Sequence, residues 1–293
     1  MDLMDSRSLA SRLRSHVDYL AEELGERNAF RYAALERARL YIEQALGQAE
    51  YAVSHDSYEV GGRTYRNVVA ELPGREEKVV VIGAHYDTAP GTPGADDNAS
   101  GIAVLLELAR LLRGFAPAPA IRWVAFTLEE PPYYRSSLMG SRVHARKCRQ
   151  RNERVVCMIS LEMLGYYSDL AGSQFYPLGI LRWFYPGCGN FIGLAGNFRS
   201  RRIVRTLARQ MSETEVIPVE HAAFPCVPGA DLSDNWSFWE EGYPGLMITD
   251  TAFLRNPHYH LPTDLADTLD YERMASVATA LEHAIRKSWP ARE

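Results

Sequence analysis

Residues 78–114 read KVVVIGAHYDTAPGTPGADDNASGIAVLLELARLLRG, and this stretch joins a continuous apolar run to a glycine- and proline-rich loop and then to a helical pattern. The apolar run is typical of a strand buried on both faces of a sheet. After the loop, one face of a helix is predicted by apolar residues at helical spacing, namely Ile102, Leu105, Ala109 and Leu112. Gly114 is a stop signal for that helix. The stretch therefore predicts a buried strand followed by a helix.

The chain on either side of this stretch continues to alternate strands with helices. Residues 57–72 predict a hairpin, because Gly61 and Gly62 separate two β-rich runs. Further strands are predicted at 120–130, 154–164, 189–196, 214–221 and 245–252, and helices at 140–150, 200–211, 231–242 and 270–289. This order predicts an α/β fold with three layers, α/β/α, around a mixed but mostly parallel central sheet.

Two amphipathic helices are predicted before the hairpin, within residues 1–50. Their apolar stripes are Leu9, Leu13, Val17, Leu20 and Leu24, and then Leu35, Ala38, Ile42 and Ala45. We expect both helices to pack on the core of a single domain, residues 1–293, because no repeat, linker or low-complexity tract divides the chain. Residues 168–189 predict a long loop, and long loops in compact domains tend to be functional.

Charge and composition exclude several classes of partner. The 37 acidic and 32 basic residues give a net charge of -5, which offers no electrostatic footprint for nucleic acid or an anionic membrane. Because no segment has the apolar core of a secretory signal or a membrane span, we expect a cytoplasmic protein. No CxxC pair occurs, so we interpret the four cysteines as reduced thiols: Cys148, Cys157, Cys188 and Cys226.

The predicted strands end on acids and histidines. These residues are His85, Asp87, Glu129, Glu130, Glu162, Asp250, His258 and His260. The loop after the first buried strand adds Asp96 and Asp97. Taken singly, a histidine at a strand end is more often structural, and two aspartates in a glycine-rich loop usually form a turn. Because ligands bind beyond the carboxyl ends of strands in such sheets, we expect the whole set to gather at one edge.

This set of side chains predicts a metal centre. Like charges near a buried sheet edge would raise one another's pKa or destabilise the fold unless a cation neutralised them. Histidine and carboxylate ligands without thiolate suit zinc, with cobalt or manganese as alternatives. Two histidines and at least three acids exceed what one catalytic zinc needs. They match two ions that share a bridging carboxylate, as in two-metal aminopeptidases.

Six ordered motifs carry a resemblance to a known family. They are GAHYDT, PGADDNASGIAVLLELAR, FTLEEPPYYRSSLMGSRVHA, SLEM, SDNWSFWEEGYPGLMITDTA and YHLPTDLADTLDY. Together they resemble the zinc-dependent aminopeptidases related to the Aeromonas leucyl aminopeptidase, glutamate carboxypeptidase II and the glutaminyl cyclases, which form peptidase family M28. The resemblance covers about residues 60–275 and implies the zinc-exopeptidase type of three-layer fold.

The resemblance also implies a set of ligands for two zinc ions. His85 and Glu162 match ligands of the first metal, and Glu130 and His260 match ligands of the second. Asp97 matches the aspartate that bridges the two. Many relatives have aspartate where this chain has Glu162, so that position departs from the family pattern.

Further roles follow from the same resemblance. Glu129 matches the general base, and Tyr259 is a candidate for stabilising the oxyanion, although it could equally pack as a wall residue. Asp87 is expected to orient the imidazole of His85, and Asp264 to be the partner of His260.

Other residues in the motifs are expected to have supporting roles. Asn98 and Ser100 are expected to shape the turn around the bridging aspartate, and His258 to be structural or to support the ligands. Asp234 matches a family aspartate that is often followed by histidine. Asn235 stands in that histidine's place, which leaves the role of the position open.

The implied reaction is amide hydrolysis by a metallo-exopeptidase, most simply a zinc aminopeptidase acting on peptides or small amides. In this mechanism Glu129 takes a proton from a metal-activated water and returns it to the leaving amine. The alternatives are a glutaminyl cyclase with a single zinc, a carboxypeptidase or dipeptidase of the same fold, and a binding module without metals. A complete set of ligands argues against the cyclase and the binding module.

The direction of cleavage stays open at this level, as does the oligomeric state. An aminopeptidase needs an acidic group for the substrate ammonium, and a carboxypeptidase needs a basic one. Arg135, Arg199 and Arg255 lie near the motifs but cannot be placed from the sequence. The aromatic residues between Phe175 and Phe191 are expected either to line an apolar substrate pocket or to pack in the core.

Overall fold

The computed structural model describes residues 3–224 and 227–290. Cys226 lies outside the described residues. The other three cysteines are free thiols, in agreement with the prediction, and Cys148 and Cys157 are buried.

An eight-stranded mixed sheet forms the middle layer, with strand order β1-β2-β4-β3-β5-β8-β6-β7. The strands are β1 (Val53–Val60), β2 (Arg63–Leu72), β3 (Glu76–His85), β4 (Pro119–Phe126), β5 (Val155–Glu162), β6 (Ile192–Gly196), β7 (Val219–Ala223) and β8 (Gly245–Thr249). The central run β4-β3-β5-β8 is parallel, as is the pair β6-β7. The antiparallel pairs are β1-β2, β2-β4 and β6-β8. The predicted mixed, mostly parallel sheet is confirmed.

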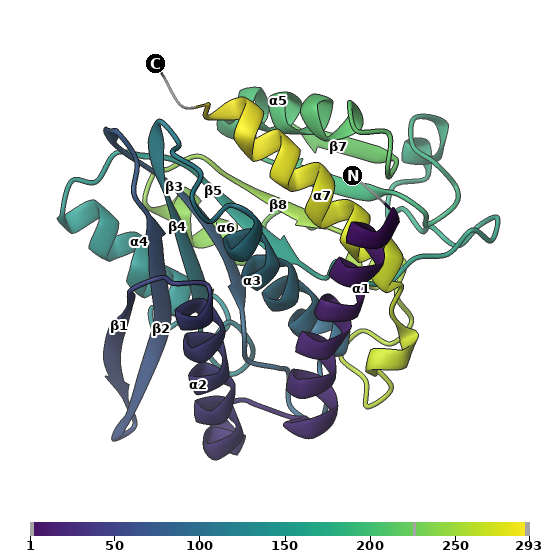
Figure 1. The fold of residues 1–293 in the computed structure, drawn as a ribbon. Coiled ribbons are helices and arrows are strands. Elements are labelled where there is room, and N and C mark those ends of the chain that lie inside the picture. Colours follow the sequence, from purple (N-terminus) through teal and green to yellow (C-terminus); the bar gives the residue numbers. More distant parts are fainter. Residues whose placement is uncertain (1–2, 225–226, 291–293) are drawn as a thin grey trace.

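Helices cover both faces of this sheet (Figure 1). They are α1 (Leu3–Val17), α2 (Tyr32–Gln48), α3 (Gly101–Leu111), α4 (Gly140–Gln150), α5 (Arg201–Ser212), α6 (Asn235–Glu240) and α7 (Tyr271–Ser288). One face carries α1, α2, α3, α5 and α7, and the other carries α4 and α6. The predicted three-layer α/β/α fold is therefore confirmed.

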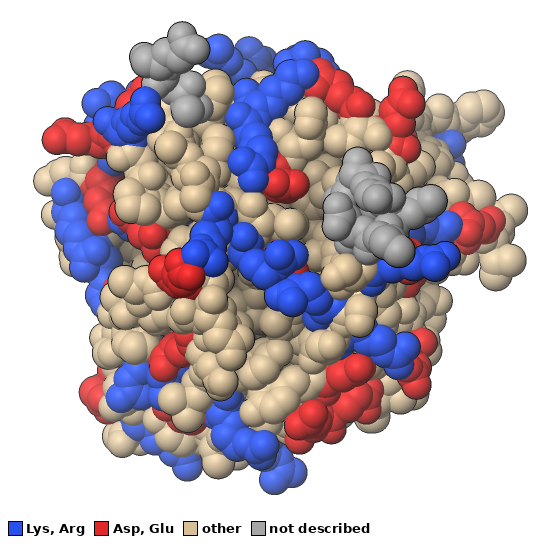
Figure 2. Space-filling view, in the orientation of Figure 1, with Lys and Arg blue, Asp and Glu red and all other residues tan. Residues whose placement is uncertain are grey.

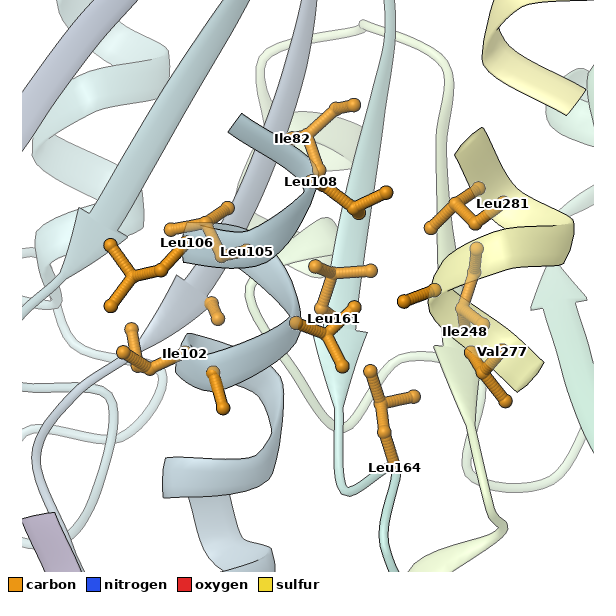
Figure 3. Close-up of a cluster of buried hydrophobic side chains, with 14 of the residues drawn as sticks. Ile82, Ile102, Leu105, Leu106, Leu108, Leu161, Leu164, Ile248, Val277 and Leu281 are labelled. Atoms are coloured by element: carbon orange, nitrogen blue, oxygen red, sulfur yellow. The ribbon is translucent and has the colours of Figure 1, made fainter. Parts of the chain in front are cut away.

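The larger core lies around α3, where every residue from 101 to 109 is buried. Side chains of α3 meet those of the sheet and of α7, and the residues labelled in Figure 3 include Ile102 and Leu105 from α3, Leu161 and Ile248 from strands, and Leu281 from α7. The sequence predicted one apolar face for this helix. The structure buries it on all sides, because α1 and α7 cover the side that faces away from the sheet.

The N-terminal helices pack on this core, with the stripe residues Leu13, Val17, Leu35 and Ile42 fully buried. Beyond α1 the chain reaches Arg27, whose side chain is also fully buried. Its guanidinium donates hydrogen bonds to the carbonyls of the loop after β3 at residues 86, 93 and 94, over 2.9, 2.6 and 2.9 Å. The N-terminal segment thus holds the loop that leads from β3 to α3.

The strands predicted at 120–130, 154–164 and 245–252 end earlier than expected, and the difference is largest at β4. The sequence suggested a strand over residues 120–130, but β4 ends at Phe126. Leu128 has a φ of 57°, a left-handed conformation that does not continue a strand. Glu129 and Glu130 therefore lie beyond the end of the strand and not within it.

Within the part of the chain that the structure describes, no helix is both long and apolar enough to cross a membrane. Acidic and basic side chains are interspersed over the face that carries α1, α2 and α3 (Figure 2). This mixture on the viewed face fits the small net charge of the chain.

Candidate active site

Five predicted ligands meet at the carboxyl edge of the central strands. His85 and Glu162 are the last residues of β3 and β5. Asp97 lies in the turn before α3, Glu130 follows β4, and His260 lies in the loop after β8. Four of the five are buried, while about a third of the His260 side chain (34%) is exposed. The fold therefore brings together residues that are up to 175 positions apart in the sequence (85 to 260).

Asp97 is the centre of this cluster. Its Oδ1 lies 3.3 Å from Nε2 of His85, and its Oδ2 lies 3.1 Å from Nε2 of His260. On one side, Nε2 of His85 is also 3.4 Å from Oε2 of Glu162. On the other, Nε2 of His260 is 3.3 Å from Oε1 of Glu130. Two groups of three side chains thus share a single carboxylate, one oxygen for each group.

The hydrogen-bonding state of these oxygens fits a bound metal. Oδ1 of Asp97, Oε1 of Glu130 and Oε1 of Glu129 are buried and accept no hydrogen bond from the described residues. A buried acceptor without a partner costs roughly 1–3 kcal/mol. Ligand atoms of His85, Asp97 and Glu130 lie within 4.8 Å of one another. Because histidine nitrogen and carboxylate oxygen are common zinc ligands, the donor set suits such a cation.

The pKa values in the cluster reflect its crowded charges. Burial alone would lower the pKa of His85, but carboxylates, above all Glu162, raise it well above its ordinary value. Burial likewise opposes the effect of Asp97 and Glu130 on His260, yet these two acids raise its pKa to about 10. Burial raises the pKa of Glu130 to about 7. Metal binding needs neutral histidines and ionised acids, so it must release protons from this site.

Asp87 contacts His85 and also two backbone N–H groups. Nδ1 of His85 is 3.1 Å from the backbone carbonyl of Asp87, whereas the nearer carboxylate oxygen is 3.7 Å away. The carboxylate instead accepts the backbone N–H groups of Glu129 and Glu130, over 3.1 and 3.0 Å. These buried N–H groups lie beyond the end of β4 and need an acceptor. Asp87 therefore positions the two glutamates.

Asp264 differs from its expected role as the partner of His260. Its carboxylate accepts the backbone N–H groups of Asp96 and Asp97, over 2.9 and 3.1 Å. The reason is again a turn with buried N–H groups that no strand or helix satisfies. Asp264 thus fixes the backbone that presents Asp97.

The turn around Asp97 is also held by the two residues predicted to shape it. The Asn98 amide donates to the carbonyl of Leu161, and its oxygen accepts the N–H of Gly101. The Ser100 hydroxyl accepts the N–H of Leu164. At Gly101 a Cβ atom would lie 2.6 Å from the Leu161 carbonyl oxygen, so the close approach of α3 to β5 requires glycine.

Glu129 sits beside the cluster without joining either group of ligands. Its side chain is buried, and Oε1 has no hydrogen-bond partner among the described residues. Burial raises the pKa of Glu129 well above its ordinary value, and the neighbouring Glu130 adds to the shift although His85 opposes it. An acid with a raised pKa and a free oxygen can hold a proton and pass it on.

Tyr259 packs its ring on the imidazole of His260, with ring centroids 3.8 Å apart and an angle of 18° between the planes. Burial raises its pKa, and nearby Asp97 and Glu130 add to the shift, so its hydroxyl keeps its proton. His258 lies outside the ligand groups, because its Nδ1 is 2.9 Å from the Thr263 hydroxyl. The structure thus places His260 in the cluster around Asp97 and His258 outside it.

Asp234 and Asn235 differ in whether their side chains are hydrogen-bonded. Asp234 is fully buried, neither of its carboxylate oxygens is hydrogen-bonded within the described ranges, and burial raises its pKa to about 7. The Asn235 amide donates to the carbonyl of Ala230 over 2.7 Å. Asn235 therefore fixes the preceding loop.

A second buried acid was not expected to matter. Asp96 accepts hydrogen bonds from the N–H of Gly165 over 2.8 Å and from the Asn256 amide over 2.7 Å. Nearby Asp250 accepts the N–H groups of Tyr166 and Ala252, both over 2.8 Å. This network ties the loops after β5 and β8 to the turn that carries Asp97. In the sequence, the only sign of it was an adjacent pair of aspartates.

An apolar pocket opens beside Glu162 and Tyr259, which both line it. Its wall includes Tyr176, Leu181 and Tyr185 from the predicted loop at 168–189. Tyr176, Tyr185 and Phe191 of this aromatic segment line the pocket, whereas Phe175, Trp183 and Phe184 are exposed and do not. None of the described residues that line the pocket is lysine or arginine.

The three arginines near the motifs lie elsewhere. Arg135 pairs with Asp231, Arg199 donates to the carbonyl of residue 242, and Arg255 is buried and donates to Gln174. None of them lines the pocket.

Comparisons with known proteins agree with this geometry. Residues 67–285 match the model of peptidase family M28. The Escherichia coli K12 protein YfbL is 40% identical over 274 residues, which are 90% of this chain and 84% of that protein. A "Probable leucine aminopeptidase" of Trichophyton verrucosum is 28% identical, and the match covers 74% of this chain and 54% of that protein.

Solved structures share the fold. A zinc aminopeptidase from Bacillus subtilis superposes with a TM-score of 0.76 at 15% identity, over 97% of this chain and 96% of that one. A glutaminyl cyclase from Fimbriiglobus ruber gives a TM-score of 0.71 at 19% identity, over 94% of each chain. At these identities the likeness concerns the fold, which aminopeptidases and cyclases have in common.

Proposed function

This chain belongs to peptidase family M28, and from that premise we propose that it is a metal-dependent aminopeptidase that hydrolyses the N-terminal bond of peptides or small amides. The observation that carries this proposal is the sharing of Asp97 between two groups of ligands, with the unpaired Glu129 beside them. We infer that residues 1–293 act as one catalytic domain, since α1 packs on α3 and α7.

The proposed metal site holds two zinc ions. His85 and Glu162 would bind one ion, Glu130 and His260 the other, and Asp97 both. Bound there, the cations would lower the pKa of a water molecule and polarise the substrate carbonyl. The oxygen of that water would bond to the carbonyl carbon, and the C–N bond of the substrate would break.

Residues of the chain manage the protons in this reaction. Glu129 accepts the proton of the attacking water and returns it to the leaving amine, which matches its burial and its free oxygen. Asp87 keeps Glu129 in place through the backbone. The Tyr259 hydroxyl keeps its proton, and in the proposed mechanism it donates a hydrogen bond to the developing oxyanion.

The chemistry of the pocket supports cleavage at the amino end. A carboxypeptidase needs a cation for the substrate carboxylate, and no described lining residue is lysine or arginine. Acids near the metal site suit a substrate ammonium instead. Glutaminyl cyclisation uses the same fold without water as the nucleophile, and it is a distinct outcome of the test below.

The test combines metal analysis with a substrate panel. We expect about two zinc ions per chain after reconstitution, and hydrolysis of aminoacyl amides with a free amino group but not of their N-acetylated forms. Release of ammonia from N-terminal glutamine alone would contradict the proposal in favour of cyclisation. Turnover of N-blocked substrates with a free carboxylate would indicate a carboxypeptidase, and absence of both metal and turnover would indicate a binding module.

A further inference from the structure

A row of residues across the sheet connects the candidate metal site to a second acid in the pocket. Glu162 on β5 pairs with Thr249 on β8, Thr249 pairs with Gly193 on β6, and Gly193 pairs with Glu220 on β7. Residues paired directly across neighbouring strands project from the same face of a sheet. All four line the apolar pocket. The pocket therefore has a candidate metal ligand at one end and Glu220 at the other.

The dimensions of this row favour a long substrate side chain. Three steps between neighbouring strands, each about 4.8 Å, separate the backbones of Glu162 and Glu220 by about 14 Å. Gly193 lies between them and has no side chain to fill the floor. The nearest atom that a Cβ on Gly193 would meet is the Thr249 carbonyl oxygen at 3.3 Å. A Cβ at this position would be in tight contact with that oxygen, so the pocket floor carries no side chain between Thr249 and Glu220.

Glu220 has no partner of its own in this pocket. It is partly buried, burial raises its pKa, and it makes no hydrogen bond or ion pair with the described residues. Burial and the nearby Glu220 carboxylate raise the pKa of Tyr176 to about 12. The hydroxyls of Tyr176 and Tyr185 donate to the carbonyls of Pro186 and His221. The two phenols therefore leave the Glu220 carboxylate free for a ligand.

We propose that the pocket receives a substrate side chain that ends in a cation, so that the enzyme prefers arginine or lysine at the substrate's N-terminus. This inference rests on the proposed aminopeptidase function. The apolar walls would contact the methylene groups, and Glu220 would pair with the terminal charge near the rings of Tyr176 and Tyr185. A leucine side chain would fill only the near part of the pocket and leave Glu220 partly desolvated without a partner.

Substrates matched in shape but not in charge test this preference. The full-length, zinc-loaded enzyme is assayed on amides of arginine and citrulline, and of lysine and norleucine. We expect kcat/KM to be about tenfold or more higher for the charged member of each pair. Glu220→Gln should bring both ratios close to one, and Glu220→Lys should invert the preference toward N-terminal glutamate. Glu215→Gln, at an exposed position outside the pocket, is the matched control and should leave the ratios unchanged.

Two results would overturn this inference while the proposed function stands. One is equal or faster hydrolysis of citrulline amide by the wild-type enzyme, a measurement that needs no variant. The other is an unchanged arginine-to-citrulline ratio in a folded Glu220→Gln enzyme. By contrast, absence of turnover on every free aminoacyl amide would overturn the proposed function itself.

Discussion

Two groups of buried acids lie next to each other at the carboxyl edge of the sheet, and they differ in how their oxygen atoms are satisfied. Around Asp96 and Asp250, all four carboxylate oxygens accept hydrogen bonds from N–H groups. Around Asp97, oxygens of Glu129 and Glu130 and one of its own accept none from the described residues. The first group is complete as it stands, and the second has buried oxygens without donors.

The contrast is sharpest between two consecutive residues. Burial and the nearby Asp250 carboxylate raise the pKa of Asp96 well above its ordinary value. Burial also acts on Asp97, but the neighbouring imidazoles of His260 and His85 outweigh it and lower the pKa of Asp97. The two consecutive residues thus have pKa values shifted in opposite directions by their neighbours. Satisfied oxygens indicate structure, and buried oxygens without donors indicate a binding site.

The largest effect is expected for Glu129→Gln. Glutamine keeps the shape of the side chain but cannot accept the proton, so kcat should fall by about 10³-fold or more while the zinc content stays at the wild-type value. Steady-state kinetics and metal analysis on the same sample measure both quantities. Loss of zinc from this variant would place Glu129 among the ligands instead.

The next effect compares Asp97→Asn with Asp96→Asn. An amide at position 97 removes the charge shared by both ligand groups, so zinc affinity should fall about 100-fold or more. Residues that bind a metal directly matter at least as much as the residues that hydrogen-bond to them. At position 96 an amide replaces an acid that lies outside both ligand groups and whose oxygens already accept hydrogen bonds, so zinc affinity should stay within a few-fold of wild type. Competition with a chelator measures both, and equal losses would refute the distinction between the two acids.

A smaller effect, on stability, is expected when hydrogen bonds are removed from the network around Asp96 and Asp250. Asp96→Ala leaves the N–H of Gly165 and the Asn256 amide without their acceptor, which should lower the free energy of unfolding by about 2–3 kcal/mol. Urea unfolding of the metal-free protein measures this change. Asp96→Asn is the matched control and should lose less, since it retains a polar group of the same shape. An unchanged urea midpoint in Asp96→Ala would show that the network adds nothing to stability.

The smallest effect concerns Glu107, a buried acid whose carboxylate pairs with basic side chains. Burial opposes the shift, but His16, Arg12 and Arg110 lower the pKa of Glu107 from 4.5 to about 2. Because the folded-state pKa is below the unfolded one, this stabilisation is present above pH 4.5 and is lost as the pH falls toward 2. Glu107→Gln should therefore reduce the difference in unfolding free energy between pH 6 and pH 3 by about 1–2 kcal/mol. Glu77→Gln, at an exposed position, should leave that difference unchanged.

Much of the fold and the gathering of the site could be predicted from the sequence. Apolar runs gave the buried strands, and His85 and Glu162 indeed terminate two of them. Because parallel strands end at one edge, residues far apart in the chain could be expected to meet there. The roles of individual ligands remain predictions that metal binding must test.

The backbone hydrogen bonds of Asp87 and Asp264 could not be predicted from the sequence, because they depend on which backbone N–H groups are left unsatisfied in three dimensions. Asp87 bonds a residue 42 positions away, and Asp264 one that is 168 positions away. Arg27 and Glu220 were missed for a similar reason. Arg27 stands in a polar segment, and nothing in the neighbouring sequence indicates that its side chain is buried. Glu220 stands beside a valine, and nothing nearby indicates that it faces a pocket.

The order of the proposed ligands along the chain also has a consequence for synthesis. A ribosome that has produced the chain up to β8 has made His85, Asp97, Glu130 and Glu162, but not His260. A nascent chain therefore lacks one ligand of the second metal until most of the fold has emerged. If both ions are needed for hydrolysis, the enzyme is inactive while the N-termini of its own nascent chains are still unfolded.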